Sequence, residues 1–261
     1  MLAGVLTRAA LVLALVGTVW ARSDVAAAQA EPRTLREAFV GAAAEDSRSS
    51  TAPPTVARYV SESGARFVFD RSGRTALLKF ENGGEIWALR PTPGPRGDII
   101  YRNDLDQPVV RTTRLGGLTL FTDVHPEGTP AALMGEARPF RLPVLTPNAL
   151  LQTLAKASER ASRAVRRIIP FEAGDQRQQV TPNSSFLVAD AANVTAYAIQ
   201  RLATTAAGRS ALSRVRKVKV LYGPRPTARL REGVLEVVIA PQLGMAGRPS
   251  SGLVLRTLAS R

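Results

Sequence analysis

The chain has 261 residues, 45% of them hydrophobic, and a formal net charge of +14 at pH 7. This length and composition suffice to bury a core, which excludes a wholly disordered protein. The chain has no cysteine and a single histidine, His125, which excludes disulfides and cysteine-bound metals and leaves too few imidazoles for an ordinary zinc site. We therefore expect no metal and no other cofactor.

The first thirty residues have the pattern of an export signal. Arg8 supplies a positive charge, residues 9–20 form an apolar run, and small residues follow up to Ala30. The apolar run has the length of a signal-peptide core and is shorter than the roughly 20 residues that span a bilayer. We therefore expect cleavage near Ala30, no transmembrane anchor after cleavage, and a soluble mature protein that begins at Glu31.

A short helix and a flexible linker are expected over residues 31–55, before the main domain. Thr34 can cap a helix because Glu37 follows three residues later, and apolar residues then recur at helical spacing. Residues 47–54 are small, polar and proline-containing, which is typical of a linker. Residues 56–261 would then form a single α+β domain.

Residues 66–122 predict an antiparallel β-meander of about six strands. Short runs of apolar or β-branched residues alternate there with turn residues at near-regular intervals. The expected strands cover residues 66–70, 75–80, 85–90, 98–102, 108–113 and 118–122. Three prolines and two glycines crowd residues 91–97, so we expect this stretch to leave the hydrogen-bond ladder.

Two helices in the second half are expected to pack on this meander and cover it. Thr146 is a suitable cap, and an apolar stripe runs through residues 147–169 until Pro170 stops it. A second helix is expected over residues 185–207, with Gly208 as its C-terminal stop. An open sheet of six strands can bury one face when such a layer covers it.

The C-terminal residues return to strand patterns. Residues 216–222 alternate in character, and the runs 228–230 and 234–239 flank a turn that contains Gly233. A last apolar run, residues 253–258, could form an edge strand. The whole pattern is that of an α+β fold.

Catalytic motifs are scarce in this sequence. No nucleophile elbow, no metalloprotease motif and no phosphate-binding glycine loop occurs in the printed chain, so no residue is assigned a catalytic role. Paired carboxylates keep one enzyme class open, because glycosidases use an acid and a base in one site. The candidates lie in or beside the turns of the meander, and they are Asp70, Glu85, Asp98, Asp104 and Asp106.

A candidate ligand-binding rim surrounds the proline-rich stretch of the meander. Its members are Arg90, Arg96, Tyr101, Arg102 and Asp104. A structural interpretation of the same residues stays open. In that interpretation, Tyr101 anchors the packed face of the sheet together with Trp87.

Basic residues, nearly all of them arginine, gather in two further places. One cluster is Arg160, Arg163, Arg166 and Arg167, and the other is Arg214, Arg216, Lys217 and Lys219. Such clusters bind polyanions, although solvated surface arginines would give the same pattern. No aromatic residues interleave with them to stack bases, and an exported protein does not meet the DNA of the cell. We therefore expect no nucleic-acid partner.

Three segments read together resemble a known family. They are residues 85–91 (EIWALRP), 97–104 (GDIIYRND) and 114–117 (RLGG). The chain resembles an uncharacterised family of exported alphaproteobacterial proteins known only as a domain of unknown function. The resemblance is densest over residues 57–125 and extends into the helical half. It implies a periplasmic or secreted protein of a Gram-negative bacterium, and it implies no activity.

These observations favour a non-enzymatic, exported protein that binds an envelope protein or an anionic polymer of the envelope. One alternative is a wall-glycan hydrolase that uses two carboxylates of the meander. A second alternative is a structural subunit that assembles through exposed edge strands.

Overall fold

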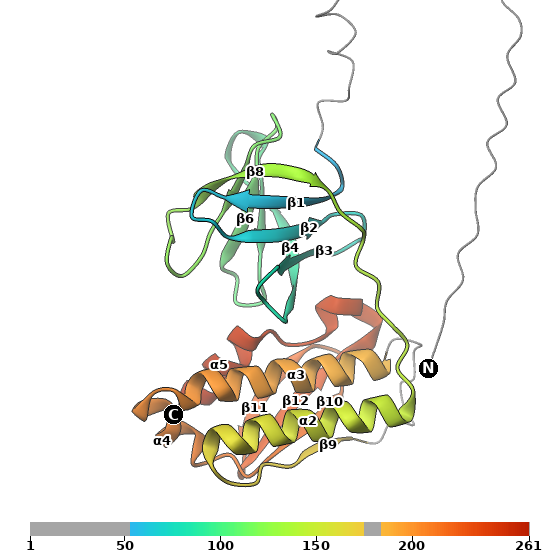
Figure 1. Ribbon diagram of the computed structural model, residues 1–261, viewed down its shortest axis with the longest axis vertical. Coiled ribbons are helices and arrows are strands. Elements are labelled where there is room, and N and C mark those ends of the chain that lie inside the picture. The colour runs from blue at the N-terminus through green and yellow to red at the C-terminus, as the bar shows by residue number, and fades with distance from the viewer. Residues whose placement is uncertain (1–52, 175–183, 261) are drawn as a thin grey trace, which may run out of the picture. The chain divides into compact units, whose positions relative to one another are not determined.

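The structure is a computed structural model, and it describes residues 53–174 and 184–260. The predicted signal peptide, the short helix and most of the linker lie outside the described residues. The fold is α+β: an eight-stranded antiparallel barrel is followed by helices and a four-stranded mixed sheet (Figure 1). Between residues 53 and 260, gap excepted, no helix combines the length and apolar character needed to cross a membrane.

The barrel contains all six predicted strands and two that the sequence did not predict. Its strands are β1 (Val56–Ser61), β2 (Arg66–Asp70), β3 (Ala76–Phe80), β4 (Ile86–Pro93), β5 (Ile99–Arg102), β6 (Pro108–Thr112), β7 (Leu118–Leu120) and β8 (Thr129–Glu136). The additional strands β1 and β8 pair with each other, with Tyr59 opposite Leu133, and so close the barrel. The predicted open meander is therefore wrong in one respect, because the sheet closes on itself.

Inward-facing side chains fill the barrel. Phe67, Phe69 and Leu78 are at most 1% exposed, as expected for a small barrel whose alternate residues point inward. The ring of Tyr101 meets that of Phe69 edge to face, with centroids 4.9 Å apart. The structural interpretation of Tyr101 is thus confirmed. Because the barrel buries its own interior, it needs no helical cover.

The proline-rich stretch does not leave the ladder where the sequence predicted. Strand β4 continues to Pro93, with Pro91 opposite Tyr101, and the excursion shrinks to the 3-10 turn η2 (Pro95–Gly97). The reason is the unequal length of the neighbouring strands. β3 pairs with β4 only as far as Leu89, so the prolines beyond it face a partner on one side only. Proline is tolerated at such an edge, since no ladder needs its missing N–H group.

The remaining elements form the second half of the fold. They are α2 (Pro147–Val165), β9 (Phe171–Ala173), α3 (Ser184–Ala203), α4 (Ala206–Leu212), β10 (Lys217–Tyr222), β11 (Thr227–Arg231), β12 (Val234–Ile239), the 3-10 segment η4 (Pro241–Gly247) and α5 (Ser251–Ala259). The sheet order is β11-β12-β10-β9, with β11 antiparallel to β12 and the other neighbours parallel.

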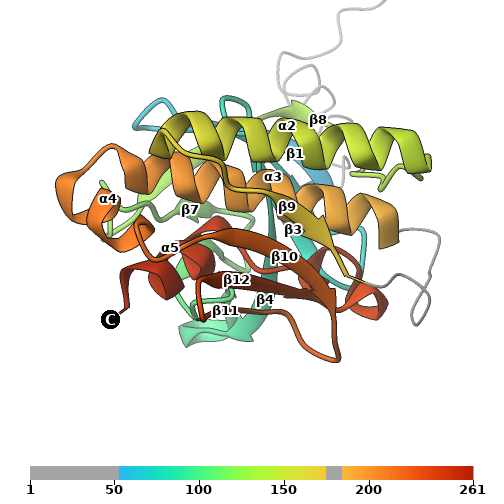
Figure 2. The ribbon, with the colours of Figure 1, turned by 90° about the horizontal axis from the view of Figure 1, so that it is seen from below.

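Helices α2 and α3 lie side by side and pack on this C-terminal sheet (Figure 2). Val218 and Val237 of the sheet join Leu187 of α3 in one buried cluster. The expectation that the two helices cover the meander is therefore wrong. The barrel contributes to this second core from its outer surface, where Leu77 and Ile86 pack against it.

Two predicted element types also need correction. Gly208 does not stop α3, which ends at Ala203; instead the Thr205 side chain caps a new helix by accepting from Gly208 N, 3.0 Å away. A Cβ atom at Gly208 would lie 1.8 Å from the carbonyl oxygen of Leu202, so the close approach requires glycine. Residues 253–258 belong to α5 and not to an edge strand, because Ser250 caps a helix there.

Two tyrosines should make the fold sensitive to alkaline pH. Burial raises the pKa of Tyr59, against an opposing effect of Arg71, and burial raises the pKa of Tyr222. A phenol whose pKa is higher in the folded state stabilises the fold below the unfolded pKa of about 10, and this contribution is lost as the pH rises through the folded pKa. We therefore expect the free energy of unfolding to fall above about pH 10.

Tyr59→Phe should reduce that loss, because phenylalanine has no proton to release. Urea denaturation of wild type and variant at about pH 8 and about pH 11 measures the difference. Tyr197→Phe is the matched control, since Tyr197 is 48% exposed. An equal loss of stability in wild type and Tyr59→Phe would contradict the assignment.

Candidate functional site

A buried arginine joins the barrel to the helical half. Arg248 follows η4, and its side chain is 2% exposed. Its Nη1 donates to Glu85 Oε1 at 3.1 Å, its Nε donates to Asp190 Oδ2, and its Nη2 donates to the carbonyl of Ile86. Glu85 also accepts from the backbone N–H and the hydroxyl of Ser251, at 3.0 and 2.5 Å. We call Arg248, Glu85, Asp190 and Ser251 the Arg248 network.

The Arg248 network keeps its charges paired in a buried place. Burial disfavours the charged form of Arg248, but the attraction of Asp190 and Glu85 outweighs burial and raises the pKa of Arg248. Two carboxylates thus share one guanidinium. Such an arrangement is costly to break, because removal of one partner leaves a buried charge unpaired. The network is therefore first of all a structural connection.

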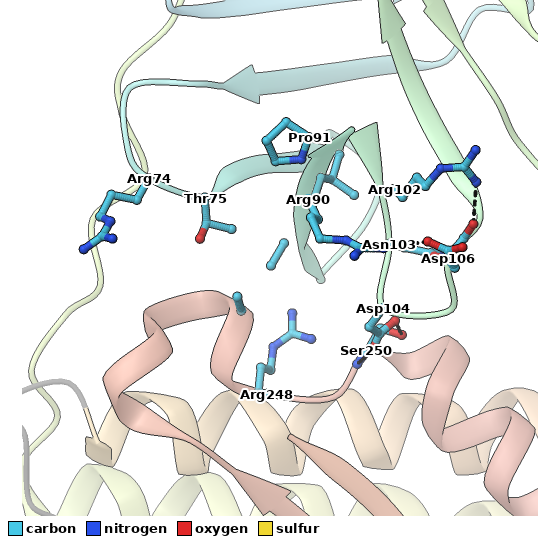
Figure 3. Close-up of a pocket in the computed structure, with 13 residues that line it drawn as sticks. Arg74, Thr75, Arg90, Pro91, Arg102, Asn103, Asp104, Asp106, Arg248 and Ser250 are labelled. Carbon is cyan, nitrogen blue, oxygen red and sulfur yellow. Dashed lines mark hydrogen bonds and ion pairs between the residues drawn. The ribbon is translucent and has the colours of Figure 1, made fainter. Parts of the chain in front are cut away.

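A cavity of about 370 Å³ lies between the barrel end and Arg248 (Figure 3). We call it the arginine cavity. Arg90 of β4 and Arg248 both line it and come from facing sides. The other lining residues come mainly from the β2–β3 and β5–β6 turns and from the start of α5; they include Arg74, Thr75, Arg102, Asn103, Asp104, Asp106 and Ser250.

The polar groups of this cavity differ in how firmly they are held. Asp104 accepts from the backbone N–H and hydroxyl of Ser250 at 2.7 and 2.6 Å, so both of its oxygens are engaged. Arg90 Nη2 lies 2.7 Å from Asp106 Oδ1, in a pair whose side chains are 68% and 69% exposed. Arg74 is exposed and makes no hydrogen bond or ion pair with any residue that the structure describes. Figure 3 shows the guanidinium groups of Arg74 and Arg102 directed away from the centre of the cavity, so the rim of the cavity carries cationic groups that are free or only weakly held.

The predicted ligand-binding rim is brought together in part. Arg90, Arg102 and Asp104 line the arginine cavity. Tyr101 lies in the barrel core, and Arg96 lies in η2 with a left-handed φ of 58°, outside the lining. The sequence did not indicate the lining residues Arg74, Asn103, Arg248 and Ser250. The last two are more than 140 positions from the rim, and no local pattern points to them.

Three of the four members of the helical basic cluster have polar partners within the protein. Arg166 ends α2 with a left-handed φ of 56° and is free of side-chain partners in the described chain. The other three are engaged: Arg160 donates to Asn193, Arg163 pairs with Glu159, and Arg167 donates to the carbonyl of Leu212. The role of this helical basic cluster as a polyanion site stays a prediction.

The second basic cluster lies among carboxylates. Register places Lys219 between Glu172 of β9 and Glu236 of β12, and Lys217 pairs with Glu172 at 3.0 Å. Arg214 donates to the carbonyls of Leu258 and Ser260, and Arg216 is exposed. This surface of the sheet is therefore mixed in charge, and its binding role is likewise still a prediction.

All five candidate carboxylates make contacts of their own. Asp70 accepts from Ser72 and Phe140, Glu85 pairs with Arg248, Asp98 with Arg111, and Asp106 with Arg90, while Asp104 accepts from Ser250. Of the five, Asp104 and Asp106 line the same cavity. Within the described ranges, no three His, Asp or Glu side chains gather to hold a metal ion.

Comparison with known families places the chain in one group. The model of the family described as "Domain of unknown function (DUF4908)" matches residues 34–258, which include the barrel and the helical half. No curated protein and no solved structure shows significant similarity to this chain. The predicted resemblance to a domain of unknown function is thus confirmed, whereas the bacterial group and export stay predictions.

Proposed function

Since the chain belongs to the DUF4908 family, whose description states no activity, we propose its function from its geometry: it is a non-enzymatic binding protein, exported to the cell envelope. Its arginine cavity takes an anionic group, a phosphate or carboxylate, of an envelope polymer. The observation that carries this proposal is that Arg74, Arg90 and Arg102 line one cavity of about 370 Å³. The signal-like first thirty residues support export.

The electrostatics of the cavity favour an anion over a cation. Guanidinium groups bind phosphate and carboxylate through paired N–H donors. Exposed ion pairs such as Arg90–Asp106 contribute little, about 0–1 kcal/mol, so an incoming anion can displace the carboxylate at small cost. Asp104 is held by Ser250 and keeps its oxygens occupied. The net charge of +14 also draws polyanions toward the protein.

Charge reversal in the arginine cavity should weaken polymer binding. We expect wild type to co-sediment with purified peptidoglycan or with anionic lipid vesicles at about 50 mM salt and less at about 500 mM, because salt screens exposed charges. Arg74→Glu/Arg90→Glu should weaken this binding by about tenfold or more, since hydrogen bonds to charged groups are lost. The sedimented fraction, measured against polymer concentration, gives the affinity.

Arg225→Glu/Arg256→Glu is the matched control for that experiment. It changes the net charge by the same amount at two exposed arginines that lie outside the cavity and outside both basic clusters. An equal loss in both double variants would assign binding to overall charge and not to the cavity. Failure of wild type to sediment with either material at low salt would overturn the proposal.

The two alternatives, a wall-glycan hydrolase and a structural subunit, also stay predictions, and fewer observations support them. A wall-glycan hydrolase would have to use Asp104 and Asp106, and Asp104→Asn would then remove activity without unfolding the protein. Assembly through edge strands is restricted by closure of the barrel, because its strands all have two neighbours. In the described chain, the edge strands are β9 and β11 of the C-terminal sheet, and α5 packs against β11.

A further inference from the structure

A second cavity, of about 350 Å³, lies on the other side of the Arg248 network. We call it the aromatic cavity. Its size is at the lower end of the roughly 300–1,000 Å³ typical of small-molecule pockets. The barrel contributes Phe80 and Trp87, and α3 contributes Tyr197. It shares no lining residue with the arginine cavity, and neither the family description nor the proposed function assigns it a role.

The apolar part of the aromatic cavity is a rigid aromatic wall. The rings of Phe80 and Trp87 meet edge to face with centroids 5.8 Å apart, so their relative orientation is fixed by packing. Tyr197 is 48% exposed, although it lies on a helix whose other faces are largely buried. Aromatic side chains that are partly or fully exposed around a concavity are suited to an apolar group of limited size.

Two of the lining residues of this cavity are arginines. Arg160 and Arg201 line it, and neither forms an ion pair with the described residues. The guanidinium of Arg201 lies over the Tyr197 ring, 5.9 Å from its centroid, and Arg160 Nη2 donates to Asn193 at 2.7 Å. Arg160 Nε is buried and has no hydrogen-bond partner among the residues that are described. These two guanidinium groups therefore favour a carboxylate group of a ligand.

Two carboxylates also line the cavity. Asp190 and Glu85 line the cavity and share the single guanidinium of Arg248. Glu85 accepts three hydrogen bonds from Arg248 and Ser251. Asp190 uses only Oδ2 for Arg248, and its Oδ1 accepts no hydrogen bond from the described part of the chain. This second carboxylate oxygen is available to an ammonium or hydroxyl donor.

We propose that the aromatic cavity binds an α-amino acid with an apolar side chain. The carboxylate of the ligand contacts Arg160 and Arg201, its ammonium group contacts Asp190 Oδ1, and its side chain packs on Phe80, Trp87 and Tyr197. The three kinds of lining match the three parts of such a zwitterion. A ligand with only one of the charges leaves either the guanidinium groups or the free carboxylate oxygen unpaired.

Calorimetric titration of the full chain with four probes tests this proposal. The probes are L-phenylalanine, L-leucine, 3-phenylpropionate, which lacks the ammonium group, and phenethylamine, which lacks the carboxylate. We expect one or both amino acids to bind, each at least about tenfold more tightly than the single-charge probes. Failure of both to bind up to about 10 mM would overturn the proposal, as would equal affinity for 3-phenylpropionate and phenylalanine.

Variants separate the two charged contacts. Arg201→Gln should weaken amino-acid binding by about tenfold, whereas Arg256→Gln, the same change at an exposed position of α5, should leave it unaltered. Asp190→Asn should weaken the binding of phenylalanine and leave the binding of 3-phenylpropionate unchanged. Because Asp190 also holds Arg248, thermal melting checks its fold, and Tyr197→Ala, at an exposed position, gives a second test of the same cavity. Unchanged binding in Arg201→Gln and Tyr197→Ala would show that the amino acid does not bind in the aromatic cavity.

Trp87 offers an independent signal because it lines the cavity. The chain has one other tryptophan, Trp20, in the predicted signal peptide. A ligand-dependent change in emission that disappears in Trp87→Phe would place the bound amino acid beside Trp87. Persistence of the change in Trp87→Phe would contradict that placement.

Discussion

Replacement of Arg248 by methionine should lower the free energy of unfolding by about 3–5 kcal/mol, because one partner of a buried ion network is removed. Glu85 and Asp190 would remain in place, with side chains only 9% and 12% exposed, and without the guanidinium that they share. The carbonyl of Ile86 would also lose its hydrogen bond from Arg248 Nη2.

Urea denaturation followed by far-UV circular dichroism measures this loss. Arg256→Met on the exposed face of α5 is the control, and it should change stability by no more than about 0.5 kcal/mol. The triple variant Arg248→Met/Glu85→Gln/Asp190→Asn should recover part of the loss, since it removes the unpaired buried charges. A loss of less than about 1 kcal/mol in the single variant would show that the network contributes little.

Phe67→Ala should destabilise the protein by a similar amount, about 3–5 kcal/mol, because it leaves a large void in a closed barrel. Phe67 is 0% exposed and contacts two aromatic rings, those of Tyr59 at 5.6 Å and Phe80 at 6.0 Å between centroids. Leu187→Ala makes the corresponding void in the second core, beneath α3, and should cost about 2–5 kcal/mol.

The two core variants also test whether the two cores unfold together. Residues 50–261 form one compact unit, although their apolar side chains gather in two separate clusters. We therefore expect Trp87 emission, which reports on the barrel, and helical ellipticity to change at the same urea concentration in both variants. A Phe67→Ala protein in which emission changes first, with ellipticity intact, would show that the barrel unfolds alone.

The sequence predicted the six central strands well because each is bounded by turn residues. It missed β8, whose residues are mostly exposed and do not alternate, and with β8 it missed barrel closure. Closure depends on pairs such as Tyr59 and Leu133, which lie 74 positions apart and leave no local pattern. The prolines after Arg90 were misinterpreted because the short reach of β3, which frees one side of β4, is a property of the assembled sheet.

Some residues of the candidate sites could likewise be predicted from the sequence, and others could not. Arg90, Arg102 and Asp104 could be predicted because polar residues at turns of a meander gather at one end of it. Arg248 could not, since its partner Glu85 is 163 positions away. Asp190 likewise lies within an apolar helix and looks like an ordinary helical residue. A short apolar run such as 253–258 does not by itself distinguish a strand from a helix. This run is helical because the Ser250 side chain caps the N-terminus of α5.

The position of Arg248 near the end of the chain has a consequence for biosynthesis. The ribosome makes the barrel first, and Glu85 emerges long before the arginine that neutralises it. Contacts between residues so distant in sequence form late, because the intervening chain must first be ordered. The junction between the two cores is therefore completed only after nearly all of the 261 residues have been synthesised. A chain that lacks these last residues would leave Glu85 without its counter-charge.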